Sequence, residues 1–415
     1  MYDMIVVGAR CAGSPTAMLL ARKGYRVLLL DKATFPSETL STHMITVGGS
    51  AQLRRWGLLD QVEATNCPPV TKIVLDLSFD LFGSFTLVGF PPPIDNGFAA
   101  IYAPKRTVLD KLLADAAVEA GAELRTDFLV KELLMDGERV TGIRGQTSGG
   151  EMVTEEARLV VGADGMRSIV ARSVEAPMYA TAPAGTCGYY TYWSGVPINA
   201  LEFYTRPDRT IVAFPTNDEQ AAIFVEWTNR EFHTFRADLE RNFVKTIDEI
   251  APDLAERVHG GQRAHHFMGT ADVPNFFRKP YGPGWALVGD AGLHKDPITA
   301  QGITDAFRDA EFLSEAIDAG IAGSRPLDEA LASYEQRRNE TIMPLYEFIC
   351  DRATLEPFPL EFQQVLAALR GNQDGIDRFF GVIQNTIPFR EFFAPENLIQ
   401  ILVGGTNLTE STATL

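Results

Sequence analysis

Apolar residues and small residues follow one another in blocks at the start of the chain, and the blocks predict two strands joined by a helix. Residues 4–7 form an apolar run of strand character that ends at Gly8. Many of residues 12–21 are small, which lets a helix begin close behind a turn with its unpaired backbone N–H groups open to an anion. A second apolar run, 27–30, ends at Asp31. This order is typical of a fold that binds the ADP half of a dinucleotide.

The middle of the chain has a different pattern, which predicts an antiparallel sheet. Residues 72–90 alternate apolar and polar positions about Gly83 and predict a hairpin. Between 185 and 278, short aromatic and β-branched runs predict four strands, at 189–196, 201–204, 210–214 and 222–227. Apolar residues at helical spacing then predict one helix that covers a face of this sheet: Phe235, Leu239, Phe243, Ile247 and Ile250.

The turn behind the first strand carries a phosphate-binding pattern with one departure. Gly8 and Gly13 occupy the first and third glycine positions of G-x-G-x-x-G, whereas Arg10 stands at the second. A glycine at that position lets the backbone approach a pyrophosphate, so the Arg10 side chain must point elsewhere or contact the ligand itself. Asp31 follows roughly twenty residues later, where a ribose hydroxyl needs an acceptor.

Two later segments also end an apolar strand with a glycine and an aspartate. The first ends in Asp164-Gly165, and the second ends in Gly289-Asp290 and continues through Pro297 to Gly302. Each places a carboxylate at the carboxyl end of a predicted parallel strand, the edge where open α/β sheets bind ligands. Together with the first segment, they resemble a large family of FAD-dependent enzymes that includes aromatic-ring hydroxylases (class A flavin monooxygenases), geranylgeranyl reductases and flavin-dependent halogenases.

The resemblance implies an α/β fold with a Rossmann-like FAD-binding domain and its β-meander, an inserted α+β substrate domain with an antiparallel sheet, and a helical C-terminal region. The aromatic-rich residues 358–403 match no motif, and they either cap the active site or form a dimer surface. The expected boundaries are 1–75, 100–184 and 279–345 for the FAD-binding domain, 76–99 and 185–278 for the substrate domain, and 346–415 for a helical cap and tail.

The resemblance also assigns residues to the ADP half of FAD. It places Gly8, Arg10 and Gly13 around the pyrophosphate and Asp31 on the adenosine ribose. It further places Arg106 at the start of a helix near the pyrophosphate. The other residues predicted to bind this part of the cofactor are Cys11, for which a space-filling role is the alternative, and Ala12, Lys32 and Val130.

At the flavin end, the resemblance places Asp290 on the ribityl chain and Pro297, Gly302 and Ile303 along the isoalloxazine. Backbone N–H groups at the N-terminus of the helix that opens after Gly302 would stabilise the negative charge of reduced flavin. Asp164, Gly165 and Gly289 complete the predicted cofactor-binding set.

Some of these residues have a structural alternative. Arg106 could be a solvated first-turn residue, although Arg at a helix start is unfavourable without a nearby anion. Asp164 could be a turn former. His43 is the one predicted catalytic residue, as a proton relay or substrate contact, and its alternative is a half-buried histidine bonded to the backbone. His265 and His266 would face opposite ways in a strand, so we expect no metal site.

Composition and charge exclude several function classes. The net charge of −17 argues against nucleic acid or an anionic membrane surface as a partner. The four cysteines lie far apart without a C-x-x-C, which indicates neither a zinc site nor a disulfide framework and favours a cytoplasmic setting. No segment has the length of a membrane span or the pattern of a signal peptide. The oligomeric state stays open.

Three functions agree with these patterns. The first is a single-component FAD-dependent monooxygenase that uses NADPH or NADH and O2 to hydroxylate a small aromatic or apolar substrate through a flavin hydroperoxide. The second is an FAD-dependent reductase of an isoprenoid-type alkene, favoured by the Asp296-Pro297 pair. The third is a non-catalytic flavoprotein in which Arg10 prevents tight cofactor placement. Residues 192–197 lack the paired-tryptophan W-x-W-x-I-P segment of halogenases, which argues against halogenation.

Overall fold

The apolar blocks at the N-terminus form the centre of a largely parallel sheet. In the computed structural model, which describes residues 1–412, β1 pairs in parallel with both β2 and β8. The carboxyl ends of these three strands therefore meet at one edge of the sheet. In spatial order the strands are β17 (Tyr281–Gly282), β18 (Trp285–Leu287), β8 (Met152–Gly162), β1 (Tyr2–Val7), β2 (Val27–Leu30) and β5 (Glu123–Arg125).

Both faces of this sheet are covered, because alternate residues of a strand point to opposite sides. Met4 and Val6 of β1 pack against a layer of helices, whereas Ile5 and Val7 pack beneath a β-meander and a short helix. The helix layer contains α1 (Gly13–Arg22), α2 (Val47–Trp56), α3 (Leu59–Glu63), α4 (Arg106–Glu119), α9 (Gly302–Ile321) and α10 (Leu327–Arg352). The opposite layer contains β6 (Phe128–Asp136), β7 (Arg139–Thr147) and α5 (Ile169–Ser173).

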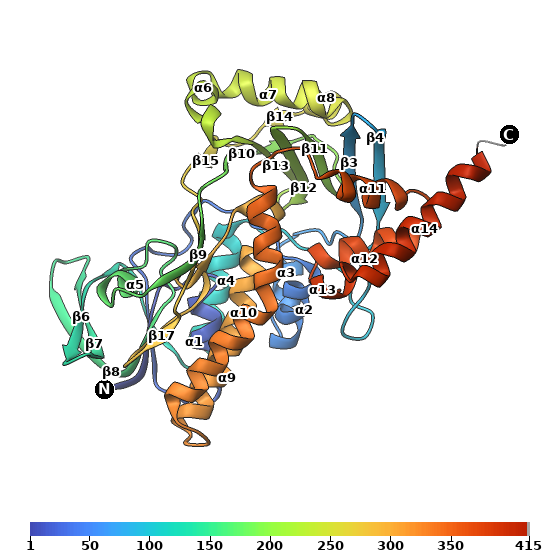
Figure 1. Ribbon diagram of the computed structural model, residues 1–415. Coiled ribbons are helices and arrows are strands. Elements are labelled where there is room, and N and C mark those ends of the chain that lie inside the picture. Colours follow the sequence, from blue (N-terminus) through green and yellow to red (C-terminus); the bar gives the residue numbers. More distant parts are fainter. Residues whose placement is uncertain (413–415) are drawn as a thin grey trace.

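A second sheet lies above the first (Figure 1). The predicted hairpin at 72–90 is confirmed as an antiparallel pair, and its first strand, β3, also pairs in parallel with β11. In spatial order the strands are β14 (Gln262–Arg263), β10 (Thr186–Ser194), β13 (Gln220–Thr228), β12 (Arg209–Thr216), β11 (Leu201–Arg206), β3 (Ile73–Phe79) and β4 (Gly83–Gly89), with β15 (Met268–Thr270) beside β10.

The helix predicted over 235–250 is broken in two, so this prediction was wrong in one respect. The chain leaves helical geometry at Asp238, with φ −144° and ψ 69°. Phe235 stacks on Trp227, with 4.2 Å between ring centroids, while Phe243 and Ile247 enter the core from the next helix. The resulting helices α6 (Phe232–Ala237), α7 (Leu239–Ile250) and α8 (Pro252–His259) cover the outer face of the second sheet, after a 3₁₀ turn at Asn229–Glu231.

A third, small sheet links the two layers: β9 (Met178–Ala182), β16 (Asn275–Arg278) and β19 (Leu293–His294). The aromatic C-terminal segment is helical and packs beside the second sheet, as α11 (Leu360–Ala368), α12 (Gln373–Ile383), α13 (Phe389–Phe392) and α14 (Pro395–Thr412). The predicted tail is thus helical as far as Thr412, and 413–415 lie outside the described residues. Among the helices of 1–412, none combines the length and apolar character needed to cross a bilayer.

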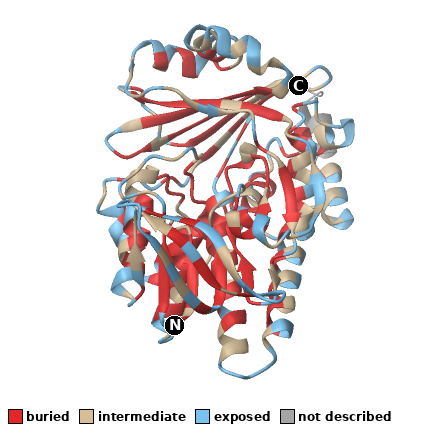
Figure 2. Ribbon diagram, turned by 90° about the vertical axis from the view of Figure 1, so that its left-hand side faces the viewer, coloured by how far each residue is buried: buried red, intermediate tan, exposed pale blue. Residues whose placement is uncertain are grey.

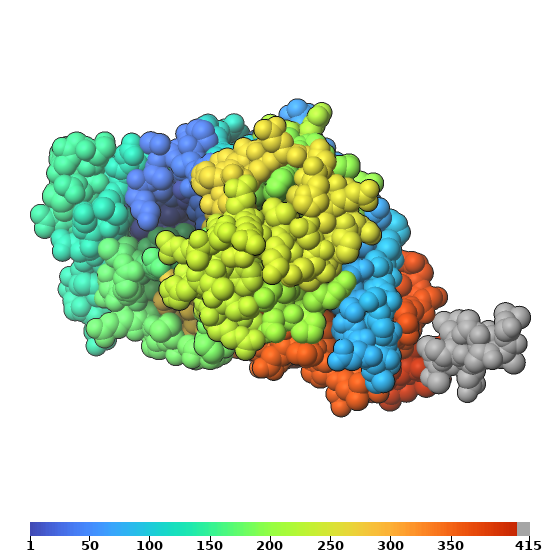
Figure 3. All heavy atoms as spheres, turned by 90° about the horizontal axis from the view of Figure 1, so that it is seen from above, coloured from blue at the N-terminus to red at the C-terminus, as the bar shows by residue number. Residues whose placement is uncertain are grey.

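The strands of both sheets are mostly buried, whereas the outer helices expose one side (Figure 2). Seen from above, the N-terminal residues lie at the bottom of a hollow between the β-meander and the second sheet (Figure 3). The edge where β1, β2 and β8 end therefore opens into the space between the two layers.

Candidate functional site

A cleft of about 1040 Å³ lies at this edge, between the parallel sheet and the second sheet. Its wall includes every predicted cofactor-binding residue except Gly13, although these residues come from distant parts of the chain. The residues brought together are Gly8, Arg10, Cys11, Ala12, Asp31, Lys32, Arg106, Val130, Asp164, Gly165, Gly289, Asp290, Pro297, Gly302 and Ile303.

The two glycines of the first turn hold the helix against the strand. Gly8 has φ +103°, a conformation that favours glycine, and a Cβ added there would lie 2.4 Å from the Ala163 carbonyl oxygen. A Cβ on Gly13 would lie only 1.7 Å from the Gly8 carbonyl oxygen. Gly13 therefore does not line the cleft, but its missing side chain is what allows α1 to begin directly beneath the turn.

Arg10 stands at the second glycine position of the turn, and its side chain points away from the turn. Its Nη1 lies 2.5 Å from Asp110 Oδ2, and its Nη2 donates to Ser37 Oγ at 2.9 Å. Arg106 Nε donates to the other oxygen of Asp110 at 2.9 Å. Two guanidinium groups thus share one fully buried carboxylate on α4, and the excess positive charge lies where a pyrophosphate is expected.

Cys11 fills the space between these groups. Its Sγ lies 3.4 Å from Asp110 Oδ1, and burial raises the pKa of the thiol, so that it stays protonated. This position agrees with the space-filling interpretation of Cys11. Asp110 was not among the predicted site residues. A carboxylate at a core-facing position of α4 is the feature of the sequence that could have indicated it.

The three predicted carboxylates are used differently. Asp31 accepts the backbone N–H groups of Ala9 and Ala33 at 2.8 and 2.9 Å, which fixes the phosphate turn to the end of β2. Asp164 accepts the N–H of Ile169 through Oδ2, while its buried Oδ1 has no protein partner. The turn-former interpretation of Asp164 therefore explains one oxygen only. Asp290 lines the cleft and is exposed, and it does not fix a turn in the way that Asp31 and Asp164 do.

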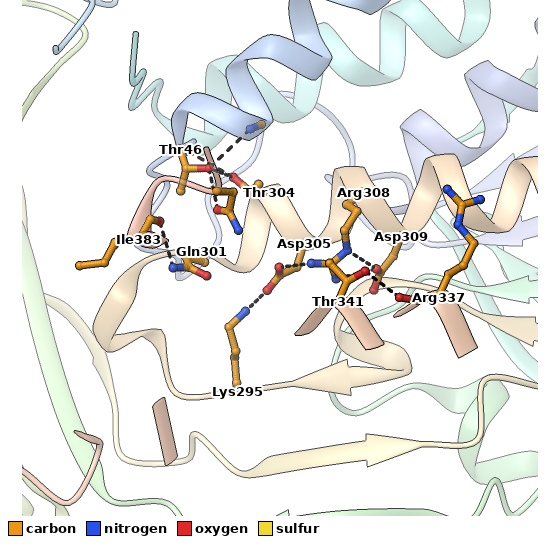
Figure 4. A network of polar contacts seen from close by, with 12 residues as sticks. Thr46, Lys295, Gln301, Thr304, Asp305, Arg308, Asp309, Arg337, Thr341 and Ile383 are labelled. Carbon is orange, nitrogen blue, oxygen red and sulfur yellow. Dashed lines mark hydrogen bonds and ion pairs between the residues drawn. The ribbon is translucent and has the colours of Figure 1, made fainter. Parts of the chain in front are cut away.

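At the other end of the cleft, charged groups gather where α9 begins (Figure 4). Lys295 contacts the carboxylate of Asp305, and both are buried. Arg308 donates to Asp305 and to Asp309, each at 2.7 Å. Figure 4 shows Lys295 reaching this helix from the loop that precedes Pro297. Burial, and then the charge of Arg308, lower the pKa of Lys295 to about 7, so the N-terminus of α9 is the feature here that favours an anionic ligand group.

The second sheet faces the cleft with aromatic rings. Tyr190 on β10 and Phe224 on β13 stack with 4.3 Å between centroids, and both line the cleft together with Gly188 and Glu226. We call these four residues the roof. Glu226 was missed in the sequence, although a lone carboxylate inside the apolar run 221–227 was a usable signal.

His43 does not reach the cleft, so its predicted catalytic role is corrected here. The ring is fully buried among Tyr190, Tyr192 and Phe214, and its Nδ1 lies 3.1 Å from the Ala103 carbonyl oxygen. Burial lowers the pKa of His43 to about 3, so the imidazole is neutral at physiological pH. These contacts are those of a core histidine bonded to the backbone, which was the alternative interpretation.

The variant His43→Ala tests this correction. We expect its FAD content and its rate of NAD(P)H oxidation to stay within about twofold of wild type, because the ring does not line the cleft and reaches it only through the packed rings of Tyr190 and Phe224. We expect the free energy of unfolding to fall by about 2–5 kcal/mol, because the substitution leaves a cavity and unpaired polar groups. Urea denaturation and stopped-flow absorbance measure the two quantities. Loss of NAD(P)H oxidation at unchanged stability would restore the catalytic role.

The argument that separated His265 from His266 was wrong. These residues lie in an irregular segment rather than in a strand, so side-chain alternation does not apply. Their rings are 4.1 Å apart, and His265 Nε2 lies 2.9 Å from the Glu38 carboxylate. The three side chains could hold a metal ion, but two of them are exposed and the ion pair accounts for the grouping. The absence of a metal site stays a prediction.

The cleft has the features that FAD requires. Gly8 and Gly13 let a helix N-terminus approach a diphosphate, Arg10 and Arg106 supply positive charge, and the buried Asp164 Oδ1 lacks a protein partner. Residues 1–348 match the model of a family described as an FAD binding domain. The chain belongs to this FAD-binding family. It is an FAD-dependent oxidoreductase, as its relatives are.

Relatives with different reactions are similar to this chain. Digeranylgeranylglycerophospholipid reductase of Methanosarcina acetivorans is 29% identical over 355 residues, which cover 82% of this chain and 81% of that protein. Kynurenine 3-monooxygenase of Salinispora arenicola is 27% identical over 365 residues, which cover 81% of this chain and 76% of that protein. The comparison therefore leaves the reaction open between reduction and oxygenation.

Solved structures share the fold over nearly the whole chain. A flavin-dependent brominase has a TM-score of 0.81 at 20% identity and covers 100% of this chain and 99% of its own. A probable FAD-dependent monooxygenase from Pseudomonas aeruginosa has a TM-score of 0.71 at 20% identity and covers 92% and 99%. At this level of identity the likeness extends to the fold alone.

Proposed function

We propose that the chain is a monooxygenase that uses NAD(P)H and O2 to hydroxylate a small, mostly apolar or aromatic substrate. The observation that carries the proposal is the roof, because its stacked Tyr190 and Phe224 rings line the same cleft as the predicted isoalloxazine residues Pro297, Gly302 and Ile303. In the proposed arrangement, the first sheet holds FAD and the second sheet binds the substrate.

When bound, FAD supplies the electron transfer from NAD(P)H and the activation of oxygen. The residues of the chain hold and orient it. Asp31 and the Arg10, Arg106 and Asp110 cluster would fix the ADP half, while the α9 N-terminus and Lys295 would stabilise negative charge at the pyrimidine edge. Tyr190 and Phe224 would exclude water from the substrate side and hold an aromatic ring by stacking.

Purification and oxygen measurements test this function. We expect a yellow protein whose NAD(P)H oxidation is stimulated by a small aromatic compound such as 4-hydroxyacetophenone. Each turnover should consume one O2, and ¹⁸O from labelled O2 should appear in the hydroxylated product, with the second atom released as water. A protein without flavin absorption, or product formation under argon, would contradict the proposal.

A second candidate, reduction of an isoprenoid-type alkene, is favoured by a separate cavity. A cavity of about 420 Å³ lies between the second sheet and the C-terminal helices, and it reaches Ile298 and Thr299 beside Pro297. Rings from both sides line it, among them Phe79, Phe203, Phe348, Phe362, Phe379 and Phe393. Such a space suits a long apolar chain. NAD(P)H-dependent saturation of a double bond without oxygen would select this function over the first.

A further inference from the structure

Glu226 has an unusual position for a carboxyl group. Only 4% of the residue is exposed, it lines the cleft, and its Oε2 has no hydrogen-bond partner in the protein. Gly188 lies directly opposite on β10, where a Cβ would come within 3.2 Å of Glu226 Cγ. The glycine therefore leaves room for this side chain, and nothing in the packing of the roof requires a charge there.

A second buried carboxyl, Asp296, lies on the same wall and interacts with Glu226 electrostatically. Burial raises the pKa of Asp296 to about 6. The carboxyl accepts Thr186 Oγ1 at 2.7 Å and the Ile298 N–H at 3.1 Å, two hydrogen bonds that favour its ionised form at neutral pH. Of the basic residues next to it in sequence, Lys295 contacts Asp305, whereas His294, whose Nδ1 contacts the Pro274 carbonyl, also interacts electrostatically with Asp296.

Two neighbouring carboxyls in a buried site resist double ionisation. Because Asp296 has the hydrogen bonds that stabilise a negative charge, the proton of the pair belongs on Glu226. Burial and the charge of Asp296 both raise the pKa of Glu226. At neutral pH the roof therefore presents a carboxylic acid, which can donate a hydrogen bond, rather than a carboxylate, which cannot.

We propose that Glu226 binds the substrate directly, by donating a hydrogen bond from its protonated carboxyl to a neutral oxygen of an aromatic molecule. The acceptor is a carbonyl, ether or hydroxyl oxygen, and the ring lies against Tyr190 and Phe224. The inference rests on the proposed function insofar as the substrate lies between the roof and the cofactor. A carboxylate-bearing substrate is disfavoured, because the Asp296 charge repels it in a site of low dielectric.

Two matched probes test the proposal on the FAD-loaded protein without turnover. Acetophenone carries a neutral carbonyl, and benzoate carries a carboxylate on the same ring. Titration of each, followed by the change in flavin absorbance, gives the dissociation constants. We expect the wild-type protein to bind acetophenone at least about tenfold more tightly than benzoate, and this affinity to fall as the pH rises through the pKa of Glu226.

Three variants separate binding from folding. Glu226→Gln keeps a donor, so acetophenone affinity should stay within about threefold of wild type and lose its pH dependence. Glu226→Leu removes the donor and should weaken acetophenone by about three- to tenfold. Glu202→Gln is the matched control, since Glu202 is a buried carboxylate of the same sheet that pairs with Arg257 on the opposite face. The Glu202→Gln substitution should change neither the affinity for acetophenone nor the pH dependence of that affinity.

Flavin content and thermal unfolding show that each variant is folded. Wild-type affinity for acetophenone in Glu226→Leu, equal binding of the two probes by the wild-type protein, or no saturable acetophenone binding would each overturn the proposal. Because the readout is binding, oxygen-independent turnover would contradict the monooxygenase function and leave this result standing.

Discussion

Gly13→Ala is expected to abolish FAD binding, with a loss of affinity of at least about 100-fold. The added Cβ would lie 1.7 Å from the Gly8 carbonyl oxygen, and both atoms belong to rigid backbone segments. Relief requires α1 to move away from β1, which withdraws the helix N–H groups from the diphosphate and opens the core beneath Ala163. The ratio of flavin to protein absorbance after purification, and titration of the apoprotein with FAD, measure the loss.

Gly149→Ala provides the control for this variant. Gly149 lies in a turn of the β-meander, where an added Cβ meets its nearest neighbour at an ordinary distance of 3.8 Å. Its FAD content should match that of the wild-type protein. A yellow Gly13→Ala protein with unchanged affinity would show that the helix N-terminus does not bind the diphosphate.

Asp110→Ala is expected to lower the free energy of unfolding of the apoprotein by about 3–5 kcal/mol. The substitution leaves Arg10 and Arg106 without the buried carboxylate that both of them contact. Addition of FAD should recover part of this loss, because its diphosphate brings negative charge to the same wall of the cleft. Urea denaturation with and without FAD measures both effects.

Asp115→Asn on the same helix is the control for Asp110→Ala. Asp115 forms an exposed pair with Lys111, so its loss should cost no more than about 0.5 kcal/mol. Equal stability of the Asp110→Ala and Asp115→Asn proteins would contradict the charge cluster. Loss of stability without any recovery by FAD would place the diphosphate elsewhere.

The first βαβ unit was predictable because its information is local. Residues 4–7 and 27–30 have no polar side chain to expose, and Gly13 tolerates a contact that no other residue can make. The antiparallel strands were predictable for the same reason. The break at Asp238 could not be predicted, because an apolar stripe of helical spacing continues across it.

Partners far apart in the chain could not be predicted. Arg10 departs from the glycine pattern of the phosphate turn, and its partner, Asp110, lies 100 residues further along the chain. His43 had the residue type of a proton relay, but its burial against Ala103 makes it a neutral core residue. The roof residues Tyr190 and Phe224 face the cleft, while their neighbours on the same strands face α7. Strand periodicity separates the two faces, but only the packing of the layers shows which face lines the cleft.

The local pattern of residues was enough to assign three distant glycine and aspartate turns to the ends of parallel strands, and with them a dinucleotide-binding site. Backbone sterics and strand periodicity are properties of a few consecutive residues, so they can be read locally. The pairing of charges, the burial of His43 and the position of Glu226 on the cleft follow from the folded arrangement and not from any local pattern. Burial and electrostatic interaction depend on distance in space, and the fold sets that distance independently of separation along the chain.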